Sequence, residues 1–305
     1  MTLFVSTKNS RNLPIDAFKG YTISVKREDL LHPIVSGNKF RKLKYNFLKY
    51  SSQKNTTVLT FGGAFSNHLA ATAHAGKTYQ IPTLGIVRGD EWAEKIEHSD
   101  TLKFCQSCGM QLFFVSREAY HEKDNNLLVQ QLMRNYQNLE ILPEGGSNKL
   151  AVKGCKEILT PEDDFFDTIC CCVGTGGTLA GLAEAAKSNQ YILGFNALKH
   201  ASIDQTIKKL TKQHNWSLIS SYTFGGYAKV TRELIDFMNA FYQQYQIPLD
   251  PVYTGKMLFG IFDLIKSNKW IWGKKILVIH SGGLQGINPM NQQLQKKGLP
   301  LLNYI

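Results

Sequence analysis

The sequence predicts an α/β protein in which open, twisted parallel sheets are wrapped by helices. Two observations support this fold class. Short apolar runs recur along the chain, and most of them are followed by turn residues and then by apolar residues at helical spacing. A short continuous apolar run is typical of a strand that is buried on both faces, as the strands of a parallel sheet are. The length of 305 residues is enough for about two domains.

Six apolar runs are expected to form the buried strands. In chain order they are TVLTF (57–61), TLGIVR (83–88), QLFFVS (111–116), TICCCV (168–173), YILGF (191–195) and KILVIH (275–280). Helical spacing appears after Thr178, in LAGLAEAAK, and around Phe40 and Leu43. No internal repeat, low-complexity tract or linker rich in proline and glycine divides the chain, so composition alone does not locate a domain boundary.

Charge and composition narrow the classes of function. The formal net charge is +11, but the basic residues are scattered in short groups, which favours a cationic surface that attracts small anions over a nucleic-acid partner. The first residues, MTLFVSTKNSRNLP, lack the apolar core of a signal peptide, and no window approaches the roughly 18 apolar residues of a membrane span. We therefore expect a cytoplasmic protein with no membrane partner.

The cysteines indicate core positions rather than disulfides or metal ligands. Cys170, Cys171 and Cys172 are consecutive in an apolar run, where neighbouring side chains point to opposite faces of a strand. Cys105 and Cys108 form one CxxC motif, but no second CxxC or spaced pair of histidines completes a zinc site. We expect this CxxC to be inert and no metal to be bound.

The turn after TICCCV has the features of a phosphate site. It comprises Gly174, Thr175, Gly176, Gly177 and Thr178. Backbone N–H groups and the positive end of a helix dipole converge where such a turn leads into a helix. The third glycine of GxGxxG is replaced by Leu179, and the Gly-Lys-Ser/Thr of a nucleotide P-loop is missing. A phosphate cradle of another kind is favoured, and a tight packing turn is the alternative.

Three further turns carry polar groups beside glycine. The SNH turn (66–68) follows two glycines at the expected start of a helix, where it could cap the helix or bind a substrate carboxylate, and the sequence does not separate these two roles. Ser281 begins a Gly-Gly turn after the last predicted strand. In DPVYTGK, Tyr253 and Thr254 precede an apolar run with helical spacing.

Taken in order, these turns resemble motifs of the fold type II pyridoxal-phosphate enzymes, whose fold is like that of tryptophan synthase β. More narrowly, they resemble the group that contains 1-aminocyclopropane-1-carboxylate deaminase and D-cysteine desulfhydrase. The motifs are GNKFRK with Lys39, SNH at 66–68, EGGSN at 144–148, GTGGT at 174–178, DPVYTGK at 250–256 and HSGG at 280–283. The resemblance runs from Lys26 to Gly283, and the family's opening segment is shortened here, so no residue before Val25 is given a role.

The resemblance implies a domain organisation and a set of partners. Residues 1–40 and 146–305 would form a large cofactor-binding domain, and residues 41–145 a small domain, with the cofactor between them. The cofactor would be pyridoxal 5'-phosphate, the substrate a small amino acid, and the assembly a homodimer.

The resemblance also implies roles for single residues. Lys39 would carry the cofactor covalently and take the substrate's Cα proton, and the field at a helix N-terminus, which disfavours a protonated amine, suits both tasks. Lys42 and Lys44 are expected to be surface charges or packing stems. Asn67 would bind the ring 3′-oxygen, and Ser66 with the backbone near His68 would hold the substrate carboxylate. Cofactor binding is implied for Lys39, Asn67, Gly174, Thr175, Gly176, Gly177, Thr178, Thr254 and Ser281, substrate binding for Ser66, Asn67 and His68, and catalysis for Lys39, Ser66, Tyr227 and Tyr253.

Two positions separate the activities within the group. The deaminase pattern resembles DPVYEGK, with a carboxylate that keeps the pyridine nitrogen protonated, whereas this chain has Thr254. At the other position, Ser281 can only hydrogen-bond a neutral pyridine, which is a weaker electron sink. We therefore expect D-cysteine desulfhydrase-type β-elimination, which gives pyruvate, ammonia and sulfide. The alternatives are 1-aminocyclopropane-1-carboxylate deaminase activity and a homologue that binds the cofactor without turnover.

Overall fold

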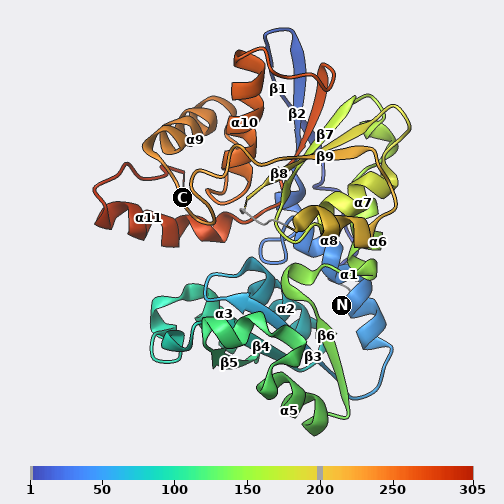
Figure 1. Cartoon of the computed structure of the whole chain (residues 1–305), viewed down its shortest axis with the longest axis vertical. Helices are drawn as coiled ribbons and strands as arrows, with labels where there is room; N and C mark the ends of the chain where they lie inside the picture. Colours follow the sequence, from blue (N-terminus) through green and yellow to red (C-terminus); the bar gives the residue numbers. More distant parts are fainter. Residues whose placement is uncertain (1–2, 198–201, 305) are drawn as a thin grey trace. The chain divides into compact units, whose positions relative to one another are not determined.

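The chain folds into two compact units, shown along the sequence in Figure 1. This computed structural model describes residues 3–197 and 202–304. Unit 1 comprises Met1–Val5 and Lys39–Gly154, and unit 2 comprises Ser6–Asn38 and Cys155–Ile305. Each unit has a sheet of its own. The predicted bounds of a cofactor-binding domain and a small domain stay a prediction, because compactness alone does not say which segments bind a cofactor.

A 4-stranded parallel sheet forms the centre of unit 1, in the order β5-β4-β3-β6. Its strands are β3 (Thr56–Gly63), β4 (Thr83–Arg88), β5 (Gln111–Val115) and β6 (Asn138–Leu142). The helices are α1 (Asn38–Ser51), α2 (Asn67–Tyr79), α3 (Asp100–Ser107), α4 (Arg117–His121), α5 (Leu127–Asn135) and α6 (Lys149–Lys156), with 3-10 helices η2 (Asp90–Trp92), η3 (Ile96–His98), η4 (Lys123–Asn125) and η5 (Glu144–Gly146). Two of the three boundaries between the units fall inside α1 and α6, and the third lies between Val5 and Ser6.

Helices cover both faces of the unit 1 sheet. Leu69 of α2 and Leu102 of α3 pack with Val87 of β4 on one face. Ile86, the neighbour of Val87, packs on the other face with Val129 of α5. Since successive side chains of a strand point to opposite faces, one continuous apolar run supplies both layers of the core.

A 6-stranded sheet forms the centre of unit 2, in the order β1-β2-β10-β7-β8-β9. Its strands are β1 (Asn12–Phe18), β2 (Tyr21–Lys26), β7 (Thr168–Val173), β8 (Tyr191–Asn196), β9 (Trp216–Ile219) and β10 (Lys275–Ile279). The helices are α7 (Gly177–Ala185), α8 (Ile203–Leu210), α9 (Arg232–Tyr245), α10 (Thr254–Lys266) and α11 (Ile287–Lys296), with 3-10 helices η1 (Glu28–Leu30), η6 (Pro161–Asp163) and η7 (Leu284–Gly286). β1 and β2 pair antiparallel, and the other pairs are parallel.

The three consecutive cysteines lie in the core on both faces of this sheet. Cys170 and Cys172 belong to the cluster that packs against α9 and α10. Cys171 belongs to the cluster on the other face, with residues of α7 and α8. Figure 1 shows α9 and α10 on one side of the sheet and α7 and α8 on the other. The predicted alternation is confirmed, and none of the cysteines that the structure describes forms a disulfide.

All six predicted strands are present, within one or two residues of the predicted bounds. β1, β2, β6 and β9 were not anticipated. β1 contains Pro14 and lies at the sheet edge, and β9 is short and only half-buried, so neither has a continuous apolar run. Two expectations need correction: the β1 and β2 pair is antiparallel, and β5, expected to be buried, is largely half-buried because it is an edge strand.

Within residues 3–197 and 202–304, none of the helices combines the length and apolar character that a membrane span requires. The same residues contain no cluster of three or more His, Cys, Asp or Glu side chains suited to holding a metal ion.

Candidate active site

The turns singled out in the sequence follow the carboxyl ends of parallel strands. In unit 2, the GTGGT turn follows β7 and the HSGG turn follows β10. In unit 1, the SNH turn follows β3 and the EGGSN turn follows β6. Open parallel sheets bind their ligands at this edge. Each unit therefore carries its own set of candidate residues.

The N-terminus of α7 lies at the predicted phosphate turn. Gly176 has a φ of 82°, and a Cβ there would lie 2.7 Å from Cγ1 of Ile207, so the position requires glycine. In the part of the chain that the structure describes, no side chain caps α7. The N–H groups of its first turn are therefore left for a ligand, and the helix dipole favours an anion. These features fit the phosphate of pyridoxal 5'-phosphate.

The residues just before Lys39 are held against two of the other motifs. Asn38 donates through Nδ2 to Oγ1 of Thr178 at 3.0 Å, and its backbone N–H donates to the Ser281 carbonyl at 3.3 Å. Gly37 has a φ of 58°, and a Cβ there would lie 1.9 Å from the Ser281 oxygen. GNK, GTGGT and HSGG thus meet around Asn38. Lys39 follows as the second residue of α1, in unit 1.

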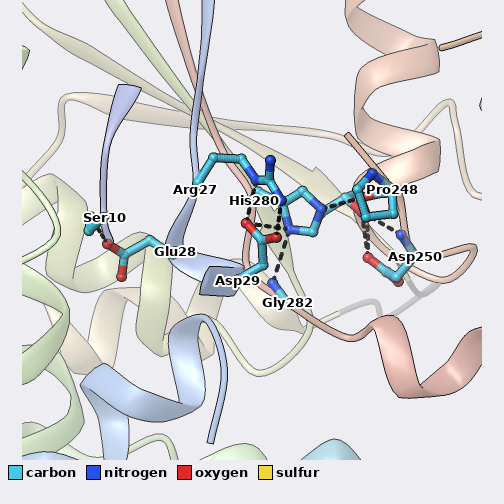
Figure 2. A network of polar contacts seen from close by, with 9 residues as sticks. Ser10, Arg27, Glu28, Asp29, Pro248, Asp250, His280 and Gly282 are labelled. Atoms are coloured by element: carbon cyan, nitrogen blue, oxygen red, sulfur yellow. Dashed lines mark hydrogen bonds and ion pairs between the residues drawn. The ribbon is translucent and has the colours of Figure 1, made fainter. Parts of the chain in front are cut away.

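A buried ionic network supports the HSGG turn, as Figure 2 shows. Arg27 donates to both carboxylate oxygens of Asp29, at 2.8 and 2.7 Å. Nδ1 of His280 lies 3.6 Å from Asp29 Oδ1 and accepts from the Gly282 N–H at 3.3 Å. Nε2 of His280 bonds to the Pro248 carbonyl at 2.7 Å. Because both ring nitrogens are engaged, the imidazole orients the backbone on either side of Ser281.

The side chain of Ser281 reaches the thiol of Cys172, with which it hydrogen-bonds. Burial raises the pKa of this thiol well above its usual value, so the thiol is protonated. The Ser281 hydroxyl, at the carboxyl end of β10, therefore faces a protonated thiol rather than a thiolate.

Tyr253 and Tyr227 form a pair beside the phosphate turn. Their ring centroids are 6.3 Å apart at an interplanar angle of 72°, and their hydroxyls share a hydrogen bond. A Cβ on Gly174 would lie 3.6 Å from the Tyr253 ring, an ordinary contact distance, so the ring lies directly beside this turn. Burial first, and then Tyr227 and Asp250, raise the pKa of Tyr253 well above its usual value. The phenol of Tyr253 is therefore protonated at neutral pH.

Thr254 is directed towards Asp250. Its hydroxyl donates to Asp250 Oδ2 at 2.6 Å and accepts from the Asp250 N–H at 2.9 Å, and the side chain is fully buried. Asp250 also accepts from the N–H groups of Val252, Tyr253 and Thr254, at 3.0, 2.7 and 2.8 Å. The Thr254 hydroxyl thus donates one hydrogen bond and accepts another within the turn. A cofactor-binding role for Thr254 stays a prediction.

In unit 1, Ser66 caps α2. Its side chain accepts from the Leu69 N–H at 3.3 Å, and Asn67 is the first helical residue. A Cβ on Gly62 would lie 2.7 Å from the Ser66 side chain, so glycine is required for this tight entry into the helix. The capping role considered for Ser66 is present, and a carboxylate-binding role for Ser66 and Asn67 stays a prediction.

His68 is buried and neutral. The Thr60 hydroxyl donates to the Leu142 carbonyl at 2.8 Å, so it must accept from Nε2–H of His68, which is 2.7 Å away. Burial, followed by the charges of Lys39 and Lys42, lowers the pKa of His68 well below its usual value. His68 therefore links β3, α2 and the end of β6 through a neutral ring.

Lys42 differs from the surface charge expected for it. Its side chain is 2% exposed, and its amine donates to the Gly145 carbonyl at 3.1 Å and to the Ser147 hydroxyl at 2.8 Å. Gly145 and Gly146 both have positive φ, and a Cβ on Gly146 would lie 3.1 Å from the His68 ring. Lys42 thus holds the EGGSN turn beside His68. Lys44 is half-buried and lies over the Tyr45 ring.

The CxxC motif has the properties of core packing. Burial raises the pKa of Cys105 to about 12 and also raises that of Cys108. Neither thiol is therefore activated as a nucleophile or as a metal ligand.

The sequence analysis gave no role to Asp29, His280, Asp250 or Lys256, all of which are buried. The sequence contains a feature that could have identified three of these four residues. Asp250 and Lys256 lie at the two ends of DPVYTGK, and His280 ends an apolar strand run, where an ionisable side chain needs a polar partner. The partners of Asp250 lie within the same turn, whereas Lys256 bonds to Thr223 and Gly226, about thirty residues away in the sequence.

The comparisons with known proteins extend over both units. The family described as "Pyridoxal-phosphate dependent enzyme" matches residues 9–282. The chain is 31% identical over 299 residues to a Thermotoga maritima protein named putative 1-aminocyclopropane-1-carboxylate deaminase, covering 90% of this chain and 93% of that one. It is 29% identical over 303 residues to the mitochondrial bifunctional D-cysteine desulfhydrase/1-aminocyclopropane-1-carboxylate deaminase of Arabidopsis thaliana, covering 88% and 74%.

A solved structure described as an ACC deaminase homologue superposes with a TM-score of 0.78 at 26% identity, and covers 91% of this chain and 89% of that one. These similarities confirm the predicted fold class and the predicted resemblance.

Proposed function

The chain belongs to the pyridoxal-phosphate dependent enzyme family, and from that premise we propose that it is a lyase of the D-cysteine desulfhydrase type. In the proposed reaction, D-cysteine and water give pyruvate, ammonia and hydrogen sulfide. The Cα–H bond breaks, and the Cβ–S bond breaks with its electron pair going to sulfur. Pyridoxal phosphate, when bound, supplies an electron sink for the pair that remains on Cα.

The cofactor is proposed to bind through residues of the GNK, SNH, GTGGT and HSGG motifs. The uncapped N-terminus of α7 suits the phosphate, because N–H groups and helix dipole both favour an anion there. Lys39 would bind the cofactor covalently, Asn67 would donate to the ring oxygen, and the Ser281 hydroxyl would face the ring nitrogen. The hydrogen bonds of Asn38 support this assignment, since they fix the residue next to Lys39.

The substrate is proposed to bind through its carboxylate at the N-terminus of α2. Ser66, Asn67 and the backbone at His68 lie in the first turn of that helix, where a negative charge is stabilised. The neutral state of His68 supports a role in orienting this turn rather than in exchanging protons. The Lys39 amine would take the Cα proton.

Tyr253 and Tyr227 are proposed to stabilise the departing sulfur. The raised pKa of Tyr253 keeps its phenol protonated at neutral pH, so its O–H is available as a hydrogen-bond donor to a thiolate. The hydrogen bond between the two hydroxyls supports their acting as one unit.

One observation carries the choice of desulfhydrase over deaminase, namely that neither partner position offers a free carboxylate. Thr254 and Ser281 stand at these positions. Asp250 is the nearby acid, and its two oxygens already accept four hydrogen bonds from the turn that Thr254 closes. A ring nitrogen facing Ser281 stays neutral, and a weaker electron sink suits prompt loss of a good leaving group.

The alternative is 1-aminocyclopropane-1-carboxylate deaminase activity, and the names of the similar proteins include both activities. The test is to supply the purified, cofactor-loaded protein with D-cysteine, L-cysteine, D-serine and 1-aminocyclopropane-1-carboxylate at equal concentration. Release of the 2-oxo acid and of sulfide is then measured, with Lys39→Ala as control. We expect pyruvate and sulfide to appear fastest with D-cysteine. Faster release from the cyclopropane substrate would favour the alternative, and a cofactor absorbance band without release from any substrate would indicate a carrier.

We also propose that the protein is a homodimer in the cytoplasm, with residues 1–40 and 146–305 forming the cofactor-binding domain and residues 41–145 the small domain. Light scattering of the purified protein tests the dimer, and a monomer at micromolar concentration would contradict it.

A further inference from the structure

The turn that carries Tyr227 has a strained backbone. In this FGGY turn, residues 223–228, Phe224 and Ala228 have φ values of 52° and 53°, and Gly225 and Gly226 have φ values of 91° and 122°. Glycine adopts such values readily, but residues with a Cβ do so only where their surroundings impose it. The Gly226 N–H donates to the Thr223 carbonyl at 3.0 Å, which closes the turn.

The buried side chain of Lys256 bonds to the backbone of this turn and stabilises its conformation. The Lys256 amine donates to the Thr223 carbonyl at 2.9 Å and to the Gly226 carbonyl at 2.8 Å. Its side chain is 2% exposed, so the amine has exchanged water for these two oxygens. Burial lowers the pKa of Lys256 to about 8, and the charge of Asp250 opposes this shift. Burying a lysine amine costs free energy, and the proposed reaction assigns no role to Lys256.

Lys256 is linked to Tyr253 through the first turn of α10 and to Tyr227 through the FGGY turn. Lys256 lies three residues after Tyr253, in the first turn of α10, and the carbonyl that it binds belongs to Gly226, the residue next to Tyr227. The two tyrosine rings then contact each other directly. Tyr227 is 45% exposed, so packing around its own side chain does little to fix it. Phe224 packs edge-to-face on Phe259, and the Gly226 carbonyl also accepts from the Lys229 N–H at 3.3 Å. Within the described residues, Lys256 adds a buried side-chain donor to the backbone beside Tyr227.

We propose that Lys256 is a positioning residue for the reaction: its amine clamps the FGGY turn so that the hydroxyls of Tyr227 and Tyr253 stabilise the leaving group together. The role in the reaction rests on the proposed function, whereas the clamp itself is a property of the folded chain. Lys256 acts through Tyr227 and does not touch the reacting atoms.

The first test is a double-mutant cycle on the cofactor-loaded enzyme. Lys256→Met keeps the length and packing of the stem and removes the donors. We expect kcat with D-cysteine to fall about 10- to 100-fold, as for other misplaced groups, with KM nearly unchanged. In a Tyr227→Phe background the same substitution should cost less than about twofold, because its effect passes through the missing hydroxyl. Lys266→Met, on the exposed last turn of α10, is the matched control and should behave as the parent.

The second test does not depend on turnover. Chymotrypsin cleaves after Phe224 and Tyr227, and cleavage in a folded protein follows local opening. We expect the Lys256→Met apoprotein to be cut in this turn about tenfold faster than the parent and the Lys266→Met control. Should Lys256→Met not fold, Lys256→Gln, which keeps N–H donors on a shorter stem, takes its place with an intermediate rate.

Equal loss of kcat in the parent and Tyr227→Phe backgrounds would overturn the positioning role, and unchanged cleavage in a folded variant would overturn the clamp. If the parent releases no product from any amino acid tested, the proposed function fails. Accelerated cleavage of the turn in Lys256→Met would then still support the clamp.

Discussion

Each unit contains one buried lysine that holds a glycine-rich turn, and the two turns differ in how much they need it. In unit 1, Lys42 donates to the Gly145 carbonyl and the Ser147 hydroxyl. In unit 2, Lys256 donates to two carbonyls of the FGGY turn. Each lysine lies three residues after a proposed functional residue: Lys42 follows Lys39 on α1, and Lys256 follows Tyr253, the N-cap residue of α10.

The difference lies in the backbone. The positive φ values of the EGGSN turn fall on Gly145 and Gly146, which adopt them without strain. The FGGY turn also places Phe224 and Ala228 in the left-handed region. The unit 1 turn therefore has a conformation that its own sequence allows, whereas the unit 2 turn depends on a contact from another element. A buried lysine can thus secure an already favourable turn or impose an unfavourable one.

The largest effect is expected at Lys39, the proposed reactive neighbour of Lys42. Lys39→Ala should abolish turnover and the absorbance band of the covalently bound cofactor, because no other amine takes its place after Asn38. Absorbance spectroscopy and a pyruvate assay measure both effects, and circular dichroism checks the fold. Full activity in this variant would show that the chemistry lies elsewhere.

The second-largest effect is expected in how the unfolding free energy changes with pH, which tests the burial of the unit 2 lysine, Lys256. Burial lowers the pKa of Lys256 to about 8 from 10.5, so between these values the unfolded chain holds a proton that the folded chain has lost. Stability contributed by this group therefore rises with pH across this window. The unfolding free energy of the parent relative to Lys256→Met should increase from pH 8 to 10.5 by on the order of 3 kcal/mol. Urea unfolding at several pH values measures it, and a flat difference would contradict the burial of the amine.

Ser281→Ala tests the proposed partner of the ring nitrogen in unit 2. Leaving that nitrogen unpaired costs about 1–3 kcal/mol, so cofactor affinity or turnover should fall roughly 10- to 100-fold. Cofactor titration and D-cysteine turnover provide the measurement. If the variant matches the parent in both, the neutral-pyridine argument fails, and with it the preference for desulfhydrase over deaminase.

The smallest effect is expected for Lys42→Met. This variant tests whether the unit 1 turn needs its lysine less than the unit 2 turn does. The EGGSN turn also has the hydrogen bond from the Gly146 N–H to the Pro143 carbonyl at 2.8 Å and the contact with His68. Loss of the Lys42 donors should lower stability by about 1–3 kcal/mol but leave protease cleavage of the turn within about twofold of the parent. Cleavage accelerated as much as in Lys256→Met would mean that both turns need their lysines equally.

Local pattern was sufficient for the six strands with continuous apolar runs, but not for β1, β2, β6 and β9. The six apolar runs formed strands because burial on both faces needs only a continuous apolar stretch. The SNH, GTGGT and HSGG turns lie at the carboxyl ends of β3, β7 and β10, and Ser66 caps α2, which is one of the two roles that its position suggested. The alternation of Cys170, Cys171 and Cys172 followed from the period of a strand.

Only the tertiary structure decided where the buried charges lie and what they hold. Lys42 reaches a turn about a hundred residues away in the sequence, and Lys26 at the end of β2 pairs with the buried Asp163 at 2.8 Å. Sequence alone could not show that Lys256 holds the FGGY turn, about thirty residues before it. A buried polar group must find a partner, but which partner it finds depends on elements that only folding brings together. Strand positions therefore follow from local composition, and the arrangement of the polar groups follows from the packing of the elements around them.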